Sequence, residues 1–277
     1  MITFKADYIS TCIDKIYTGY VMQIFDEAIN VLGNKPLWIL GPSKGPQPLG
    51  IKLNFLPAPR KGDLLLKDDK IVRLGENYEI DLTGSKIWST SGLALVDINR
   101  SMYNKVVFWA KRYIVHPEYV DALINGKFEL HNLDELVIKR LRGLVADAIK
   151  GAGFERAKGM IGLGTGLTPS GDDALVGMLA SLRGSDQFAK LAKIVKNNFK
   201  NTNWISQGYL QCAAMGEFGF EAAGVIEACN DANYLEFSIK AASQIGQSSG
   251  SFFMLGFISG LKIRMSHDSA KSLKLPD

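Results

Sequence analysis

The sequence predicts an α+β protein in which a β-rich N-terminal region, either a small barrel or a sandwich, precedes a mainly helical C-terminal region. Most of the nine prolines and a series of short apolar runs lie in the first hundred residues, whereas apolar residues recur with helical spacing from about Met102 onward. Two Gly/Ser-rich loops each precede a helical run in the second region. We therefore divide the 277 residues into a β-rich domain (1–100), a helical ligand-binding domain (101–265) and a tail (266–277).

The expected strands of the N-terminal region are short apolar runs bounded by glycine, proline or charged turn residues. A helix is expected before them over residues 21–32, with Gly33 and Asn34 as its end. The expected strands cover residues 37–40, 51–55, 64–66, 71–74, 78–82 and 93–98.

The second region contains several amphipathic patterns. The clearest covers residues 133–149, with Asn132 as its N-cap and Gly151 after its end. Further helices are expected over residues 188–199, 205–216, 218–229, 232–245 and 252–263, and the chain from about Ser266 has the character of a frayed tail.

Composition excludes several classes of protein. Apolar residues make up 47% of the chain, enough for a substantial core, yet no apolar run approaches the roughly 20 residues of a membrane span. A net charge of +4 suits a small anionic partner but is too weak to indicate nucleic-acid binding. The N-terminus lacks a signal-peptide layout, and Cys12, Cys212 and Cys229 show no metal spacing, so a cytoplasmic location is expected.

The most informative segment is Gly-Leu-Gly-Thr-Gly-Leu-Thr-Pro-Ser-Gly-Asp-Asp at residues 162–173. Its alternating glycines leave backbone amides uncovered, and Ser170 is a good N-cap for a helix that begins at Gly171. Asp172 and Asp173 then fall in the first helical turn, where a bare phosphate would be repelled. The segment lacks the Gly-Lys-Ser/Thr of a Walker A loop, and Leu167 interrupts a dinucleotide-binding pattern.

Three interpretations of this segment remain open. In the first it is only a tight turn with a capped helix. In the second the loop holds an anionic group while Asp172 and Asp173 bind Mg²⁺ or orient a substrate N–H, and no other cofactor is expected. In the third one of the two carboxylates is a general base.

A second loop, Gly246 to Ser251, resembles the first. Ser170-Gly171 and Gly177 align with Ser249-Gly250 and Gly256, which suggests either an old duplication or a chance likeness of two turns. If the two units pack side by side, both helix N-termini would point into one pocket, and the glycines at 177 and 256 would allow close helix contact.

The 162–173 segment resembles the signature of a bacterial and archaeal family, some members of which are labelled carboxylases, that includes the AllH-type subunit of oxamate carbamoyltransferase. The likeness extends to Gly19–Phe25, Ala28–Asn30, Gly50, Lys61–Asp63 and the residues from 205 to 216, so it covers the chain from about Gly19 to Leu261. In that family's pattern the second loop reads Gly-His-Ser/Thr-Ser-Gly-x-Asp, whereas here Gln247 and Phe252 stand at the His and Asp positions. If the chemistry of that family uses these two groups, this protein is either altered in specificity or no longer catalytic.

The resemblance implies an enzyme or enzyme subunit of carbamoyl transfer, acting on an oxamate- or ureido-type acid in purine or nitrogen catabolism. Its partners would be a small anionic molecule and other subunits of a carbamoyltransferase complex or copies of itself. The alternatives are a noncatalytic subunit or small-molecule sensor, and a Mg²⁺-dependent phosphotransferase or carboxylase-like enzyme. We expect Asp172 and Asp173 to be catalytic and the following residues to bind substrate: Gly164, Thr165, Gly166, Thr168, Ser170, Gly171, Gln247, Ser248, Ser249 and Gly250.

Overall fold

The computed structural model describes residues 1–96, 98–126 and 132–272, with side chains described as far as His267. Internal contacts divide the chain into two compact units. The first consists of Met1–Gly92 with Glu217–Phe220, and the second of Leu93–Gly216 with Glu221–Asp277. The domain limits expected from the sequence, 1–100, 101–265 and 266–277, stay predictions.

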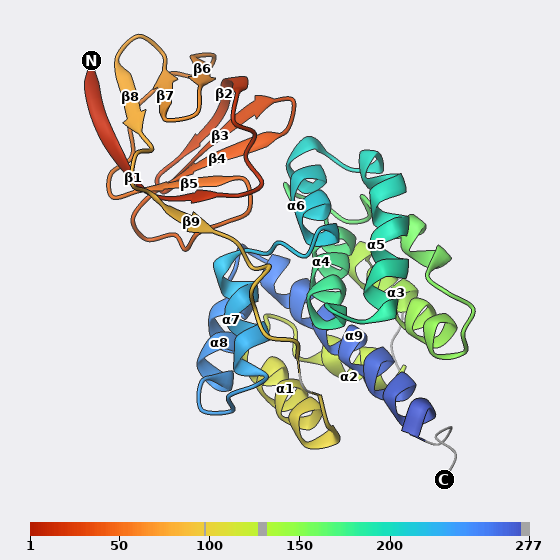
Figure 1. Cartoon of the computed structure of the whole chain (residues 1–277). Helices are drawn as coiled ribbons and strands as arrows, with labels where there is room; N and C mark the ends of the chain where they lie inside the picture. Colours follow the sequence, from red (N-terminus) through yellow and green to blue (C-terminus); the bar gives the residue numbers. More distant parts are fainter. Residues whose placement is uncertain (97, 127–131, 273–277) are drawn as a thin grey trace. The chain divides into compact units, whose positions relative to one another are not determined.

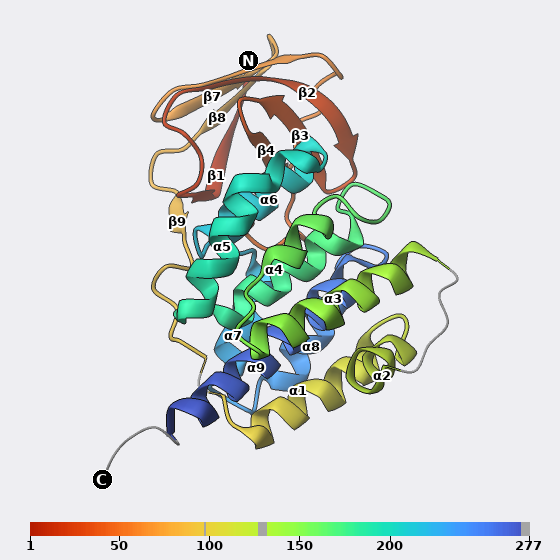
Figure 2. The same ribbon diagram turned by 90° about the vertical axis from the view of Figure 1, so that its right-hand side faces the viewer.

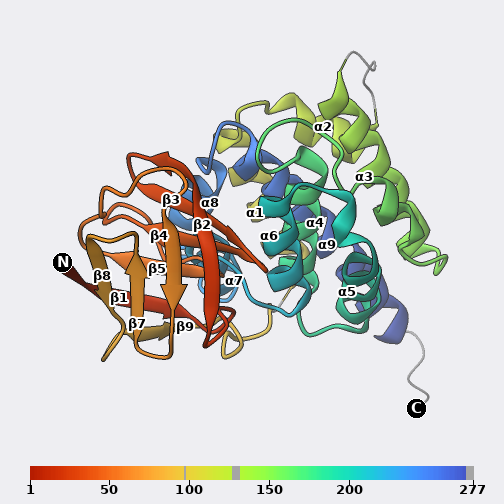
Figure 3. The same cartoon turned by 90° about the horizontal axis from the view of Figure 1, so that it is seen from above.

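The first unit is a closed β-barrel of eight strands with one additional strand (Figures 1 and 3). Its strands follow in the order β5-β4-β3-β2-β6-β7-β8-β1, and β1 also pairs with β5, which closes the ring. The prediction of a β-rich region is confirmed, and of its two forms the barrel is the one adopted. The strands are β1 (Ile2–Ser10), β2 (Tyr17–Phe25), β3 (Ala28–Gly33), β4 (Pro36–Leu40), β5 (Gly50–Leu53), β6 (Leu64–Lys67), β7 (Ile71–Leu74), β8 (Tyr78–Asp81) and β9 (Lys86–Trp88).

Strand β1 closes the barrel because it changes partners along its length. Its first half pairs in parallel with β8, its second half pairs antiparallel with β5, and β9 joins its end in parallel. A register shift between Ala6 and Tyr8 marks a bulge in this strand, a usual device for bending a sheet. The interior is filled by alternate apolar side chains, among them Val21, Ile39 and Leu65, which are fully buried.

Two expected elements of this region are wrong. The expected helix over residues 21–32 is instead the hairpin of β2 and β3, joined by a two-residue turn at Asp26 and Glu27. Its apolar residues are largely β-branched or aromatic, and both strands find partners in the barrel. The expected strand over residues 93–98 also fails: residues 93–96 form no strand, Asp97 lies outside the described residues, and Asn99 caps the first helix.

The second unit is helical, as expected (Figure 2). Asn132 accepts a hydrogen bond from the Glu135 amide, so the predicted N-cap of α3 is confirmed. The last helix continues to Ser272, so residues 266–272 are helical rather than frayed. The α-helices are α1 (Arg100–Tyr113), α2 (Glu118–Asn125), α3 (Leu133–Ile149), α4 (Ser170–Leu182), α5 (Asp186–Asn198), α6 (Trp204–Ala214), α7 (Phe220–Ala228), α8 (Leu235–Ser243) and α9 (Ser249–Ser272).

Helices α4 and α9 lie side by side in parallel and touch through glycines. A Cβ atom on Gly177 would lie 1.9 Å from the Phe253 carbonyl oxygen, and one on Gly256 would lie 1.8 Å from that of Ala174. Main chain therefore packs directly on main chain, and no larger residue fits at either position. The predicted close contact through Gly177 and Gly256 is confirmed. Within the described part of the chain, no helix is both long and apolar enough to cross a membrane.

Candidate functional site

The N-terminal ends of α4 and α9 meet in the helical unit. The Thr168 hydroxyl, just before α4, lies 2.8 Å from the Ser249 hydroxyl, which opens α9. The condition considered from the sequence, that the two loop–helix units pack side by side, is thus met. The partial positive charges of two parallel helix ends add at this point, so it is the candidate site.

The first loop is held by glycines in left-handed conformations. Gly162, Gly164 and Gly166 have φ angles of 77°, 120° and 91°, which other residues adopt only with strain. The Leu163 amide donates to Met160 and the Gly171 amide to Leu163, which closes the base of the loop. Among the described residues, the amides of Gly164, Thr165 and Gly166 have no hydrogen-bond partner, and Thr165 and Gly166 are exposed.

Ser170 is not the N-cap that the sequence suggests. Helix α4 begins at Ser170 itself, and the Ser170 hydroxyl donates to Asp134 of α3 at 2.7 Å. The amides of Asp172 and Asp173 donate to the Pro169 carbonyl. Most first-turn donors of α4 are therefore already used, and the hydroxyls of Thr168 and Ser249 bond to each other, so the amides of residues 164–166 are the donors left without a partner among the described residues.

Gly171 and Gly250 have equivalent structural roles after their serines. A Cβ atom on Gly171 would lie 2.1 Å from the Met160 carbonyl oxygen, and one on Gly250 would lie 2.2 Å from that of Ala242. In each unit the preceding segment packs on the second residue of the helix. The Ser-Gly pairs match in geometry as well as in sequence.

Asp172 is a buried anchor for the loop. One carboxylate oxygen accepts from the Gly162 amide at 2.8 Å, and the other accepts from the hydroxyls of Thr202, at 2.5 Å, and Ser206, at 2.7 Å. Burial raises the pKa of this carboxyl above 3.8, and the three hydrogen bonds oppose that shift. Both oxygens are thus engaged inside the protein, so a metal ion would have to displace these donors.

Asp173 has a different environment, although it is the next residue. The residue as a whole is partly exposed, but its Oδ2 atom is buried and has no hydrogen-bond partner among the described residues. Burial raises the pKa of Asp173 well above 3.8, the charge of Asp172 adds to the shift, and hydrogen bonds with Ser249 and Thr168 oppose it. Of the two predicted catalytic carboxyls, this is the one at the joined helix ends.

Tyr209 and Glu221 also belong to this neighbourhood. Burial raises the pKa of Tyr209, and the charges of Glu221, Asp173 and Cys212 raise it further. Tyr209 follows Ser206 by three residues on α6, so the two side chains share a helix face that meets consecutive residues of α4. The three-residue spacing from Ser206 could have indicated Tyr209 from the sequence. No pattern in the sequence around Glu221 indicates that residue.

The second loop contributes less than the first. Gln247 is exposed, and the Ser248 carbonyl accepts from the Phe252 amide. Phe252 is 1% exposed and packs near Tyr119, with ring centroids 6.0 Å apart. The position at which the resembled pattern has an Asp is therefore part of the apolar core. Within the ranges that the structure describes, no group of three or more His, Cys, Asp or Glu side chains is placed to hold a metal ion.

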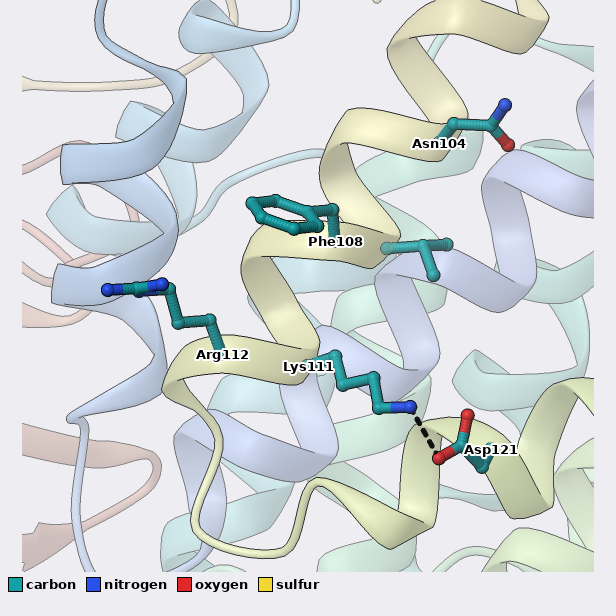
Figure 4. A pocket seen from close by; sticks show the side chains of 6 residues that line it. Asn104, Phe108, Lys111, Arg112 and Asp121 are labelled. Carbon is teal, nitrogen blue, oxygen red and sulfur yellow. Dashed lines mark ion pairs between the residues drawn. The ribbon is translucent and has the colours of Figure 1, made fainter.

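An open pocket of about 460 Å³ lies elsewhere in the helical unit, on α1 and α2 (Figure 4). Lys111 of α1 and Asp121 of α2 form an ion pair there at 2.6 Å, beside the exposed ring of Phe108. None of the residues expected to bind substrate lines it. The pocket is therefore separate from the site at α4 and α9.

The fold and the site together define a two-unit α+β protein, in which a closed barrel accompanies a helical unit with paired glycine-rich loop–helix elements. A family model described as oxamate carbamoyltransferase subunit AllH matches residues 160–261. Over this part of the chain, which is less than half of its length, the sequence is similar to the AllH-type family. Neither a curated protein nor a solved structure matches the chain.

Proposed function

We propose that this chain is a subunit of a carbamoyl-transferring enzyme of the oxamate carbamoyltransferase type and that it binds a small anion at the joined ends of α4 and α9. The observation that carries the proposal is the extent of the family match. It begins at Met160, directly before the first loop, and ends at Leu261, within α9. It therefore spans both loop–helix elements and the helices between them.

The chemistry of the site supports an anionic ligand. The amides of Gly164 to Gly166 and the hydroxyls of Thr168 and Ser249 are hydrogen-bond donors, and they sit at the positive ends of two helices. Such an arrangement can hold a carboxylate or phosphate oxygen and stabilise charge that develops during carbamoyl transfer. Ser248 and Gly250 form the opposite wall in this proposal.

A noncatalytic role within the same assembly is the second candidate. Its specific support is that Gln247 and the buried Phe252 stand where the resembled pattern has a proton-transferring His and an Asp. The family description names a subunit, so we place the chain in a complex with other subunits. None of the three cysteines forms a disulfide among the described residues, which agrees with the cytoplasm as the proposed compartment.

The test is a reconstitution. The chain is purified with its partner subunits, and transfer of the carbamoyl group from carbamoyl phosphate to oxamate is followed by the appearance of oxalurate and phosphate. We expect transfer to require this chain and to fall about tenfold in Ser249→Ala, because one hydroxyl donor at the ligand is lost.

Ser266→Ala is the matched control, since the Ser266 hydroxyl lies on the same helix but donates to Lys262 of that helix. Equal activity of Ser249→Ala and the wild type would move the site away from the helix ends. Full transfer by the partners without this chain would contradict the proposed function itself.

A further inference from the structure

We propose that Thr202 is a positioning residue of the anion site and fixes the direction of the free amides at residues 164–166. It acts through Asp172, which in turn holds the Gly162 amide at the start of the glycine loop. The inference rests on the proposed function for the nature of the ligand. It gives the turn between α5 and α6 a role that the sequence did not indicate.

The turn between α5 and α6, residues 199–203, packs directly on the start of the glycine loop. A Cβ atom on Gly162 would lie 2.4 Å from the Asn201 carbonyl oxygen, and the φ angle of Gly162 is 77°. Position 162 therefore requires glycine both for its backbone conformation and for its contact with the turn. A shift of the turn would displace the loop.

Three consecutive hydrogen bonds connect α6 to the loop through this turn. The Gln207 side chain donates to the Thr202 carbonyl at 2.8 Å, and the Thr202 hydroxyl donates to Asp172 at 2.5 Å. The other Asp172 oxygen accepts from the Gly162 amide at 2.8 Å. Hydrogen bonds to a carboxylate are stronger than those between neutral groups, so Thr202 is the firmest link between the turn and α4.

The third glycine of the loop leaves space for a ligand. A Cβ atom on Gly164 would lie 2.6 Å from the Ser170 amide nitrogen, so Gly164 is packed as closely as Gly162. A Cβ atom on Gly166 would meet nothing within 4 Å, and both Thr165 and Gly166 are exposed. The loop is therefore held at its first two glycines and open at its third, where we place the ligand.

A support of this kind matters because the loop is rich in glycine. Ordering the backbone costs about 1–2 kcal/mol per residue, and glycine loses the most freedom. Contacts that order Gly162 before a ligand arrives remove part of that cost from binding. Loss of the Thr202 hydroxyl should therefore weaken anion binding even though Thr202 is not one of the donors assigned to the ligand.

The first experiment uses no ligand and follows hydrogen exchange of the backbone amides by NMR at pH 7. Thr202→Val keeps the shape of the side chain and loses its hydroxyl, whereas Thr202→Ser keeps the hydroxyl. We expect the Gly162 amide to exchange about tenfold faster in Thr202→Val and to stay within about threefold of the wild type in Thr202→Ser. Equal exchange in Thr202→Val and the wild type would overturn the proposal.

Ser181→Ala is the matched control for both experiments. It removes a buried hydroxyl from α4 that donates to the Met178 carbonyl of the same helix, away from the loop. We expect it to leave the exchange of Gly162 unchanged. Faster exchange of Gly162 in this control, to the same degree as in Thr202→Val, would show a general loss of stability and refute the positioning role.

The second experiment measures binding of oxamate and, separately, of inorganic phosphate by calorimetry. We expect about tenfold weaker binding in Thr202→Val, recovery to within about threefold in Thr202→Ser, and no change in Ser181→Ala. Gln207→Met keeps the length of the side chain but loses the donor to the Thr202 carbonyl, so it should bind about threefold more weakly. It carries the test if Thr202→Val does not fold. Equal affinity of Gln207→Met, Thr202→Val and the wild type would overturn the proposal.

The results distinguish this inference from the proposed function. Weaker phosphate binding confined to Thr202→Val and Gln207→Met, without carbamoyl transfer by the reconstituted wild type, would support the positioning role and refute the proposed reaction. Carbamoyl transfer by Thr202→Val with the affinity and rate of the wild type would refute the positioning role and leave the proposed function intact. Failure of both probes to bind the wild type would refute the anion site and, with it, the role of Thr202 there.

Discussion

Replacing Asp173 by Asn should stabilise the protein, and the gain should grow with pH. In the folded state burial raises the pKa of Asp173 well above its ordinary value of 3.8, so the folded protein keeps a proton that the unfolded chain has lost. The stability that this group contributes is complete below the unfolded pKa and is lost as pH rises toward the folded pKa. Asn does not titrate, so the variant escapes this loss.

The magnitude follows from one proton. A difference of one bound proton changes the free energy of unfolding by about 1.4 kcal/mol per pH unit, so the variant should gain on the wild type by up to that slope as pH rises from the unfolded pKa toward the folded pKa of Asp173. Urea unfolding at each pH, followed by circular dichroism of the helices, measures this difference. Glu227→Gln, an exposed change on α7, is the control for general charge effects.

The reasoning would be refuted if the difference in free energy of unfolding between the wild type and Asp173→Asn did not change with pH. If the curves of wild type and Asp173→Asn stay parallel from pH 4 to pH 8, Asp173 has an ordinary pKa in the folded state. If the variant is less stable at every pH, the carboxylate makes favourable contacts that the described hydrogen bonds do not include.

Two further outcomes are expected. Gly256→Ala should lower the free energy of unfolding by about 3 kcal/mol or more, because the new Cβ would collide with the Ala174 carbonyl. The control is Gly224→Ala on α7, where the new Cβ would come no closer than 3.7 Å to the Ser238 side chain. This control should be neutral or stabilising by about 0.5–1 kcal/mol. Thermal melting distinguishes the two, and equal melting temperatures would contradict the close helix contact. Asp172→Asn should destabilise by about 1–3 kcal/mol, because its amide group would face one of three donors; an unchanged melting temperature would show that these hydrogen bonds contribute nothing.

The barrel strands show what local pattern can and cannot predict. Strands β6, β7 and β8 follow from short apolar runs with turn residues between them, and they were predicted nearly to the residue. The hairpin of β2 and β3 was missed because its apolar residues also fit a helical period, and only pairing with β4 and β6 decides between the two. Strand β1 was missed because its partners come from distant parts of the chain.

The candidate site was predictable where its residues are consecutive. Thr168, Asp173 and Ser249 belong to the two Gly/Ser loop–helix units that the sequence singles out, and the side-by-side packing that the sequence leaves as a condition is the one found. The different environments of Asp172 and Asp173 were not predictable, since they depend on which neighbouring helix each side chain faces. Glu221 belongs to neither loop in the sequence. Only tertiary packing brings its charge near Tyr209.

The glycine contact between α4 and α9 makes the spacing of their two ends a property of the backbone. Side chains at an ordinary helix interface can change rotamer and let the helices slide, but at Gly177 and Gly256 carbonyl groups meet the opposite backbone. The distance between Thr168 and Ser249 at the helix ends is thereby fixed by backbone contacts further along the two helices. Variants at these glycines should therefore change the spacing of Thr168 and Ser249 as well as lower the stability of the protein.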